Sequence, residues 1–293
     1  MSPTTLRRLR RILMFVASLA LVVIGWEVYK AVGPEQGGSV LGWKILPRTN
    51  DLAMPHVSDV LTRLTEPVQP RQPERVWWVV LKATWYSFRL AIVGFAIGVA
   101  AGLGLAIVMT RFRLVERGLL PYLVVSQTIP LIALAPVMVQ WGGQLHVGPF
   151  DWPRWLSASV LGAFLAFFPI SVGALRGLKS PAPAALELMD SFAAPWRQTL
   201  WKLRFPAAVP HIVPASRLSA AAAVIGVVVA EMSTGLGGGL GRLILVYSQQ
   251  STGDPSRLYC AIIGAAILGL TMAGIVLVTD VVLMRHRPRE STT

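Results

Sequence analysis

Charged residues and cysteines are scarce in this sequence of 293 residues. Only 14% of the residues are charged, whereas soluble domains carry roughly 25%, so the chain has too little charge to cover a soluble surface. A single cysteine, Cys260, excludes an internal disulfide and leaves the redox compartment open. The four histidines are scattered without the spacing of a metal site, so we expect no bound metal.

Acidic residues are few as well: 14 stand against 27 Lys and Arg, which gives a net charge of +13. Such an excess can mark a nucleic-acid-binding protein. Here, however, the basic residues cluster at the ends of apolar runs, and membrane proteins carry excess Lys and Arg in their cytoplasmic loops. We therefore interpret the charge as a topology signal and expect no nucleic-acid partner.

Motifs that bind phosphate or carry covalent chemistry are missing. The glycine-rich stretch 235–241 lacks the Lys-Ser/Thr pair of a phosphate-binding loop and the glycine spacing of a dinucleotide fingerprint. No nucleophile stands beside a base in a pattern that predicts a membrane enzyme. We therefore expect no enzymatic activity and no cofactor in this chain, and we interpret 235–241 as a flexible turn or re-entrant segment before a helix over 242–250.

Long apolar runs are what the chain has in abundance, since 54% of its residues are hydrophobic. A run of about 20 apolar residues spans a bilayer core of about 30 Å. The predicted fold is therefore all-α: a polytopic membrane protein with six transmembrane helices and a pair of cytoplasmic coupling helices. The expected spans are 12–32, 76–109, 118–140, 155–175, 207–232 and 258–284, of which the second is too long for one straight span.

The basic residues predict the orientation of these spans. More than half of the Lys and Arg fall in segments before the first span, after the second, after the fourth and after the sixth. The positive-inside rule then places both termini in the cytoplasm. The run 12–32 follows a basic start and could also be a signal peptide; we expect an uncleaved helix, because no small-x-small cleavage site precedes polar sequence.

Three glycines recur at four-residue spacing in the second apolar run, at Gly94, Gly98 and Gly102. Small residues in this register let helices approach closely. Two interpretations remain open at this point: packing between helices of one chain, or a dimerisation face.

One charged, amphipathic segment lies between the fourth and fifth spans. Ser180 and the prolines that follow it predict a helix start. Apolar residues then recur at helical spacing on either side of Pro195, which indicates two short helices at an angle: Leu186, Met189 and Phe192 before it, and Trp196, Leu200 and Leu203 after it. Such a pair fits the groove of a soluble partner, while the alternative is a helix lying on lipid headgroups.

This segment also carries a recognisable spacing. Glu-Ala-Ala, three residues, Gly, nine residues, then Ile-x-Leu-Pro is the cytoplasmic signature of the inner-membrane permeases of ATP-binding-cassette (ABC) importers. The chain resembles it with the same spacing, with the departures of Leu188 and Met189 for the two alanines and Ala193 for the glycine. Alanine takes a left-handed turn less easily than glycine, so we expect the bend to be made differently, with Pro195 compensating. The residues that the resemblance assigns to ATPase coupling are Glu187, Asp190, Ala193, Leu203, Phe205 and Pro206.

The resemblance extends from about residue 84 to 283 and is greatest to the nitrate/sulfonate/taurine branch of these permeases. Its landmarks include Ser87-Phe-Arg-Leu, Phe168-Pro169, and Ala230-Glu231 followed by Gly235-Leu-Gly237. The stretch Ser126-Gln-Thr-Ile-Pro130 leans toward members that carry thiamine-pyrimidine precursors or riboflavin. The resemblance divides the chain into an N-terminal tail, helix and external loop (1–83), a permease core (84–285) with its coupling segment (181–206), and a basic cytoplasmic tail (286–293).

The resemblance implies a homodimer of this chain in a prokaryotic inner membrane, with two ABC ATPase subunits that hold ATP-Mg docked on the coupling segment. An extracytoplasmic binding protein would deliver a small polar or anionic solute. A secondary transporter without an ATPase is the alternative, although such proteins usually show internal repeats and charges near the midplane of the membrane; this sequence has no internal repeat and few buried charges.

Polar residues inside the expected spans are candidates for the translocation path, because burying them in a membrane is costly. The candidates are Gln127, Thr128, Pro130, Arg217 and Glu231. All of these except Pro130 also have a structural interpretation. Gln127 and Thr128 could hydrogen-bond between helices, Arg217 could pair with the coupling segment, and Glu231 could pair with Arg242 or face the binding protein.

Overall fold

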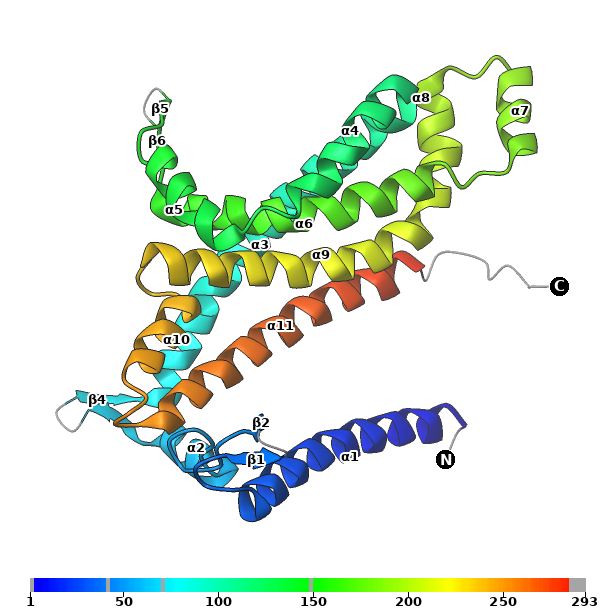
Figure 1. The fold of residues 1–293 in the computed structure, drawn as a ribbon. Helices are drawn as coiled ribbons and strands as arrows, with labels where there is room; N and C mark the ends of the chain where they lie inside the picture. Colours follow the sequence, from blue (N-terminus) through cyan, green and yellow to red (C-terminus); the bar gives the residue numbers. More distant parts are fainter. Residues whose placement is uncertain (1–2, 41–42, 70–71, 148–149, 285–293) are drawn as a thin grey trace. The chain divides into compact units, whose positions relative to one another are not determined.

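The computed structural model describes residues 3–40, 43–69, 72–147 and 150–284. These residues are mainly helical, which confirms the all-α prediction (Figure 1). The helices are α1 Pro3–Val32, α2 Val57–Thr65, α3 Val76–Arg111, α4 Arg113–Ser126, α5 Leu131–Gly142, α6 Arg154–Leu178, α7 Pro183–Ser191, α8 Trp196–Thr199, α9 Phe205–Thr234, α10 Leu240–Gln249 and α11 Pro255–Met284. A π-helical turn, η1, covers Leu200–Arg204 between α8 and α9. The predicted basic tail, 286–293, lies outside the described residues.

Short antiparallel hairpins complete the described part of the chain. The hairpins pair β1 Gly38–Val40 with β2 Trp43–Leu46, β3 Pro67–Gln69 with β4 Gln72–Arg75, and β5 His146–Val147 with β6 Phe150–Asp151. Each lies in a segment that the sequence predicts to be a loop, so the hairpins do not change the fold class.

Five helical segments of the described chain are long and apolar enough to cross a membrane: Leu13–Val32, Val76–Arg111, Arg154–Leu178, Trp196–Thr234 and Pro255–Thr279. They correspond to the first, second, fourth, fifth and sixth predicted spans. The second is one unbroken helix of 36 residues. At 1.5 Å per residue it is about 54 Å long, well beyond a bilayer core of about 30 Å.

The third predicted span, 118–140, is wrong as a single straight helix. It is broken into α4 and α5, whose axes differ by 103°. Pro130 stands at the N-cap of α5. A proline has no N–H to donate to the preceding turn and disfavours helical backbone at the residue before it, Ile129. The helix therefore stops at Ser126, and the chain counts six spans only if this bent pair is one of them.

The described chain forms two compact units, the first of which comprises Met1–Val80 and Val246–Ile263. Here α1 is held to the loop after it: Glu27 accepts a hydrogen bond of 2.8 Å from the Val57 amide at the start of α2, and Lys30 donates to Asp51 at 2.6 Å. Asp254 accepts from Arg63 of α2 at 2.6 Å. Within the predicted external loop, α2 is a short helix, Val57–Thr65.

The second unit comprises Leu81–Leu245 and Gly264–Thr293, and α6 and α9 run side by side within it (Figure 1). These two helices approach so closely that a Cβ on Gly177 would lie 2.7 Å from the Ala208 Cα, and one on Gly226 would lie 2.8 Å from the Gly162 Cα. Small residues let apolar helices pack at this distance where lipid is the solvent.

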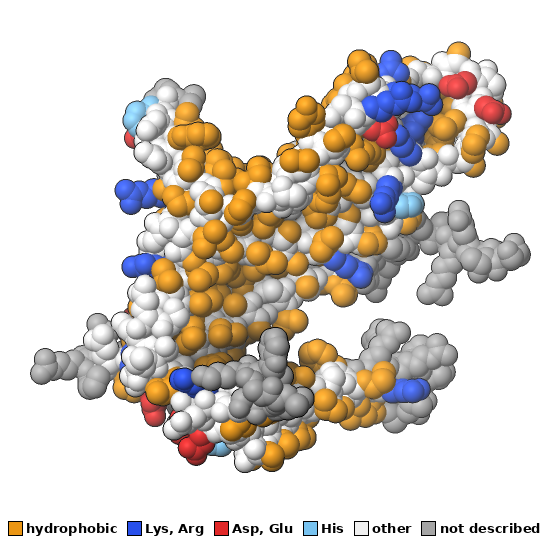
Figure 2. Space-filling model, in the orientation of Figure 1, with side chains coloured by type: hydrophobic (Ala, Val, Ile, Leu, Met, Phe, Trp, Pro, Cys, Tyr) orange, Lys and Arg blue, Asp and Glu red, His pale blue; other side chains and the backbone are white. Residues whose placement is uncertain are grey.

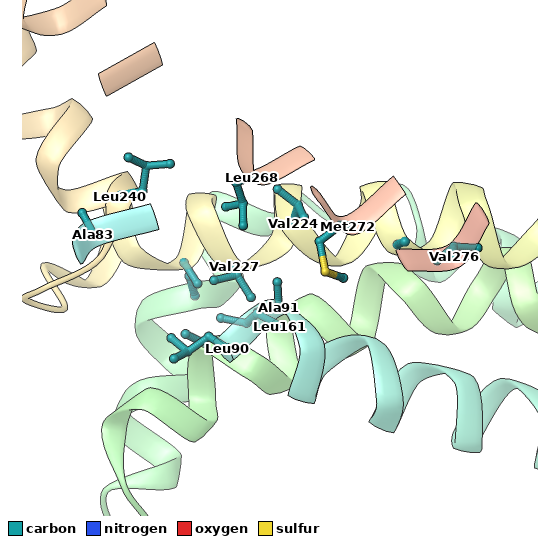
Figure 3. Close-up of a cluster of buried hydrophobic side chains, with 14 residues drawn as sticks. Ala83, Leu90, Ala91, Leu161, Val224, Val227, Leu240, Leu268, Met272 and Val276 are labelled. Atoms are coloured by element: carbon teal, nitrogen blue, oxygen red, sulfur yellow. The ribbon is translucent and has the colours of Figure 1, made fainter. Parts of the chain in front are cut away.

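A cluster of buried apolar side chains joins α3, α5, α6, α9, α10 and α11 in the second unit (Figure 3). Its members include Leu90, Leu161, Val227, Leu268 and Met272, each at most 4% exposed. A second cluster, centred on Met109, Leu178 and Leu200, joins the ends of α3 and α6 to η1. The core therefore fixes both ends of α9 relative to α6.

The glycines Gly94, Gly98 and Gly102 lie against α6. A Cβ on Gly94 would come within 2.5 Å of the Ser159 carbonyl oxygen, and one on Gly102 within 2.7 Å of the Phe167 carbonyl oxygen. The three glycines thus let α3 and α6 of one chain pack closely. Of the two interpretations left open by the sequence, the structure supports packing within the chain.

Candidate coupling segment and transport path

The segment between α6 and α9 is the charged, amphipathic stretch of the sequence. After α6 the chain forms α7, turns at Phe192–Pro195, and continues through α8 and η1 into α9. Pro183 stands in the first turn of α7 and Pro195 is the N-cap of α8, positions where a missing N–H costs no helical hydrogen bond. The prolines therefore separate two helices, as the sequence predicts.

The turn after α7 is made by Ala193 itself. Its φ is +49°, a left-handed conformation that no other non-glycine residue of the described chain adopts. The Ala193 amide donates to the Asp190 carbonyl at 2.9 Å and the Ala194 amide to the Met189 carbonyl at 3.0 Å. These two bonds form a Schellman motif, whose left-handed position is usually a glycine. The expectation that Ala193 would avoid this conformation and leave the bend to Pro195 is wrong.

The second helix of the pair does not end before the fifth span. Through η1, where the Phe205 amide donates to the Leu200 carbonyl five residues earlier, α8 continues into α9. A π-turn holds one more residue than an α-turn, and such turns occur frequently at functional sites. The signature residues Leu203, Phe205 and Pro206 lie in this turn and in the first turn of α9. The second half of the candidate coupling segment and the fifth predicted span are therefore one helical rod.

The second half of the segment is anchored to the body of the protein. Thr199 and Leu200 are buried, and Arg204 donates from Nη1 to the Leu178 carbonyl at the end of α6, at 2.9 Å. The Arg111 guanidinium lies over the Trp196 ring, 5.4 Å from its centroid. A hydrogen bond to a carbonyl, a cation–π contact and a buried leucine together fix α8 to the ends of α3 and α6.

The first half of the segment is exposed. On α7 and its C-cap, Glu187 and Asp190 are exposed together with Leu188 (57%) and Phe192 (75%). Figure 2 shows acidic side chains where α7 lies, and a gathering of basic side chains where α4 and α8 lie. Two exposed large apolar residues among two carboxylates make a surface that suits a partner with an apolar pocket and a basic rim.

The path candidates Gln127, Thr128 and Pro130 lie together in the bend between α4 and α5. Gln127 is half-buried, whereas Thr128 and Pro130 are exposed. The Thr128 hydroxyl donates to the Val125 carbonyl at 2.8 Å, so within this chain its partner is local backbone. The structure therefore brings three of the five candidates to one kink.

The other two candidates lie on α9, apart from each other. Arg217 and Glu231 are fourteen residues apart, which is about 21 Å along a helix. Arg217 is exposed. Glu231 is fully buried and accepts hydrogen bonds from Ser87 and from the Gly241 amide, rather than forming the pair with Arg242 that the sequence allowed.

Sequence reasoning missed the partners of Glu231. Ser87 stands 144 residues earlier, and it entered the sequence analysis only as a landmark of the family resemblance. Spacing along the chain carries no information about a contact at this separation. The one available signal was that Ser87 and Glu231 are both landmarks of the same resemblance.

Comparison with known proteins places this architecture in a family. Residues 94–291 match the family described as "Binding-protein-dependent transport system inner membrane component". The chain is 37% identical to the formylaminopyrimidine transport permease protein of Halalkalibacterium halodurans over 47% of its own residues and 52% of that relative, so it spans about half of that relative's length.

Two further relatives match over longer stretches. A probable ABC transporter permease protein of Haemophilus influenzae is 30% identical over 67% of this chain and 73% of the relative. A putative aliphatic sulfonates transport permease protein of Bacillus subtilis is 31% identical over 62% of each chain. With the family match covering well over half of its residues and five helices suited to a membrane, the chain is a multi-pass membrane protein that belongs to the family of binding-protein-dependent transport system inner membrane components.

Proposed function

We propose that this chain is the permease subunit of an ATP-driven, binding-protein-dependent importer of the prokaryotic inner membrane. Family membership and the names of its relatives support a transport role. The single observation that carries the coupling to ATP is α7. It is an exposed helix with acidic and apolar side chains, joined by an anchored second helix to a membrane-spanning rod.

In this proposal an ABC ATPase subunit, which holds ATP-Mg, docks on the coupling segment. Leu188 and Phe192 enter an apolar pocket of the ATPase, and Glu187 and Asp190 face basic residues at the rim of that pocket. Because α8 and η1 continue into α9, a displacement of the segment by the closing ATPase is passed to a span without an intervening hinge. The chain thereby switches access to the path between the two sides of the membrane.

The solute passes beside the bend between α4 and α5, where Gln127, Thr128 and Pro130 lie, and Arg217 of α9 attracts an anion. Exposed apolar residues flank the bend, among them Tyr122 (74%), Val125 (61%) and Ile132 (66%). We assign this surface to a second copy of the chain, so that a homodimer encloses the path. An extracytoplasmic binding protein delivers the solute, and both termini of the permease lie in the cytoplasm with the coupling segment.

The solute class follows from the relatives. One is named for formylaminopyrimidine and one for aliphatic sulfonates. Both names describe small polar compounds, and the second describes anions. We therefore propose a sulfonate- or nitrate-like anion, or a thiamine-pyrimidine or riboflavin-type compound, as cargo.

The test is co-purification of the chain with its cognate ABC ATPase, comparing wild type with Glu187→Arg. Reversal of an exposed charge on α7 removes complementarity with a basic rim, so we expect the variant to lose most of the bound ATPase. The control is Glu35→Arg, which reverses an exposed carboxylate in the segment between α1 and β1 and should retain wild-type binding. If the wild-type chain binds no ATPase, the protein is instead a secondary transporter.

A further inference from the structure

A buried polar network joins three helices of the second unit at the end of α9 that is remote from the coupling segment. Ser87 of α3 donates to the Glu231 carboxylate, with Oγ 2.7 Å from Oε1 and 2.8 Å from Oε2. The Gly241 amide donates to Glu231 Oε2 at 2.8 Å, and the Leu240 amide donates to Ser87 Oγ at 2.8 Å. Ser87 and Glu231 are both 0% exposed.

The network satisfies the start of α10. The first N–H groups of a helix have no partner within the helix, and here the first two amides of α10 bond to Ser87 and Glu231. A carboxylate at this position also interacts favourably with the positive end of the helix dipole. Thus Glu231 links the Gly241 amide at the start of α10 to α9, and Ser87 links the Leu240 amide to α3. We call these four residues, Ser87, Glu231, Leu240 and Gly241, the α10 latch.

Two glycines leave room for the α10 latch. A Cβ on Gly239 would overlap the Glu231 carboxyl group, and a Cβ on Gly241 would overlap the Val228 carbonyl oxygen. By contrast, a Cβ on Gly237 would meet no atom within 4 Å, and the φ of Gly237 is not positive. The glycine-rich stretch 235–241 is therefore shaped around the carboxylate and is not simply a flexible turn.

We propose that Glu231 is a positioning residue that makes α9 and α10 one rigid unit, so that movement imposed on the coupling segment at one end of α9 is delivered to α10 at the other. The helix α9 has 30 residues, which is about 45 Å at 1.5 Å per residue and longer than a bilayer core. Its two ends therefore lie on opposite sides of the membrane. This inference rests on the proposed function for the origin of the movement, whereas the latch itself does not.

The burial of Glu231 decides between this role and a direct one in the path. A path residue must present its charge to a solute, but the Glu231 side chain is enclosed and its two oxygens accept from two donors within the protein, the Ser87 hydroxyl and the Gly241 amide. The Glu231 carboxylate holds the start of α10, so it can affect a solute only through the position of α10. Substitution of Glu231 should therefore change how α10 responds and leave the charge of the path unchanged.

The latch is tested on the full chain in lipid nanodiscs by amide hydrogen exchange of α10. In Glu231→Gln the side-chain NH2 group adds a donor where the carboxylate had only acceptors, so either the Gly241 amide or the Ser87 hydroxyl loses its acceptor, and the Ser87 Oγ that accepts from the Leu240 amide is disturbed. We expect exchange of the Leu240 and Gly241 amides to accelerate at least tenfold in Glu231→Gln and in Gly239→Ala. The matched variant Gly237→Ala should exchange as wild type does. Unchanged exchange in Glu231→Gln overturns the latch.

Delivery of movement is tested in the complex of the chain with its ATPase, by trapping it with ATP and vanadate. In the wild type, trapping should change exchange both in 196–204 and in α10. In Glu231→Gln the change in 196–204 should remain and that in α10 should vanish. A purely structural role would alter both together. If α10 still responds in the variant, or never responds in the wild type, the positioning role is overturned; failure of the wild-type chain to bind ATPase overturns the proposed function but leaves the nanodisc result on the latch intact.

Discussion

Ala193 is the only non-glycine residue with a positive φ in the part of the chain that the structure describes. Its φ of +49° places Cβ close to the carbonyl that follows, a contact that costs roughly 1–2 kcal/mol in an L-residue. The hydrogen bonds of the turn to Asp190 and Met189 hold it there. The position at which the resembled signature has glycine is thus occupied by a residue under strain, at the junction between the exposed α7 and the anchored α8.

Replacement of Ala193 by glycine should therefore stabilise the coupling segment. We expect the turn to gain about 1 kcal/mol, because glycine adopts positive φ without a steric cost. The measurement is amide hydrogen exchange of residues 193 and 194, which should slow about fivefold if they exchange by local opening.

The neighbouring substitution Ala194→Gly is the matched control for this change, since Ala194 does not have a positive φ and gains only unfolded-state freedom from glycine. Its exchange should quicken or stay the same. Equal slowing in both variants would show that the effect is not relief of a left-handed alanine.

At Ala193 and Glu231 the structure differs from what the sequence led us to expect, for different physical reasons. Ala193 was expected to avoid the left-handed region because that conformation has a steric cost in alanine. The hydrogen bonds of the turn and the prolines on either side of it outweigh a cost of roughly 1–2 kcal/mol. For Glu231 the sequence left open a local pair with Arg242 or contact with the binding protein, whereas its partner Ser87 comes from a helix far away in the sequence. Local rules supply a preference at each residue, and neither burial nor a distant donor can be read from them.

At the scale of the element, apolar length and proline explain most of what the sequence predicted. The ends of α6, α9 and α11 lie within about five residues of the predicted spans, because a run that must cross a membrane ends where polar residues begin. Pro130 breaks the run 118–140, but Pro136 lies within α5 and Pro210 within α9 without ending either helix. A proline therefore marks a possible break, and neighbouring helices decide whether it becomes one.

The packing of α3 on α6 gives an element-scale prediction with opposite signs at two glycines. A Cβ on Gly98 would lie 2.7 Å from the Ala166 Cβ and 3.1 Å from the Ala163 carbonyl oxygen, whereas one on Gly104 would meet nothing within 4 Å. We expect Gly98→Ala to destabilise the fold by about 1–3 kcal/mol through overpacking. We expect Gly104→Ala to leave the stability of the fold unchanged or to raise it by up to about 1 kcal/mol, because alanine has a better helix propensity than glycine.

Thermal unfolding of the two variants in the same detergent measures this difference. The midpoint should fall for Gly98→Ala and stay level or rise for Gly104→Ala. A similar fall in both would mean that α3 needs flexibility at glycine rather than close approach to α6. A fall in Gly104→Ala alone would place another helix, such as one of a second copy, on that face.

At the scale of the whole molecule, the sequence supplies the order of the spans and their direction through the membrane. The order is confirmed by the helices, because each long apolar run becomes a helix or, at 118–140, a bent pair. The direction stays a prediction, since it depends on the distribution of Lys and Arg and not on any contact within the chain. It assigns the coupling segment to the cytoplasm and the segment between α10 and α11 to the outside.

The single native cysteine makes this direction testable. Cys260 is fully buried, so the wild-type chain should react little with a membrane-impermeant maleimide and provides the background. Gln198 of α8 and Thr252 between α10 and α11 are both exposed. The helix α9, Phe205–Thr234, lies between Gln198 and Thr252, so cysteines introduced at the two positions should lie on opposite sides of the membrane.

In intact spheroplasts we expect Thr252→Cys to be labelled by the maleimide and Gln198→Cys to be labelled only after permeabilisation. The expectation depends on α9 crossing the bilayer once and on α10 staying on the outer side without crossing back. Labelling of Gln198→Cys alone in intact cells would reverse the orientation and remove the coupling segment from the ATPase. Labelling of both would mean that α9 does not span. Either result would contradict the assignment of α7 to an ATP-driven partner, because ATP is on the cytoplasmic side.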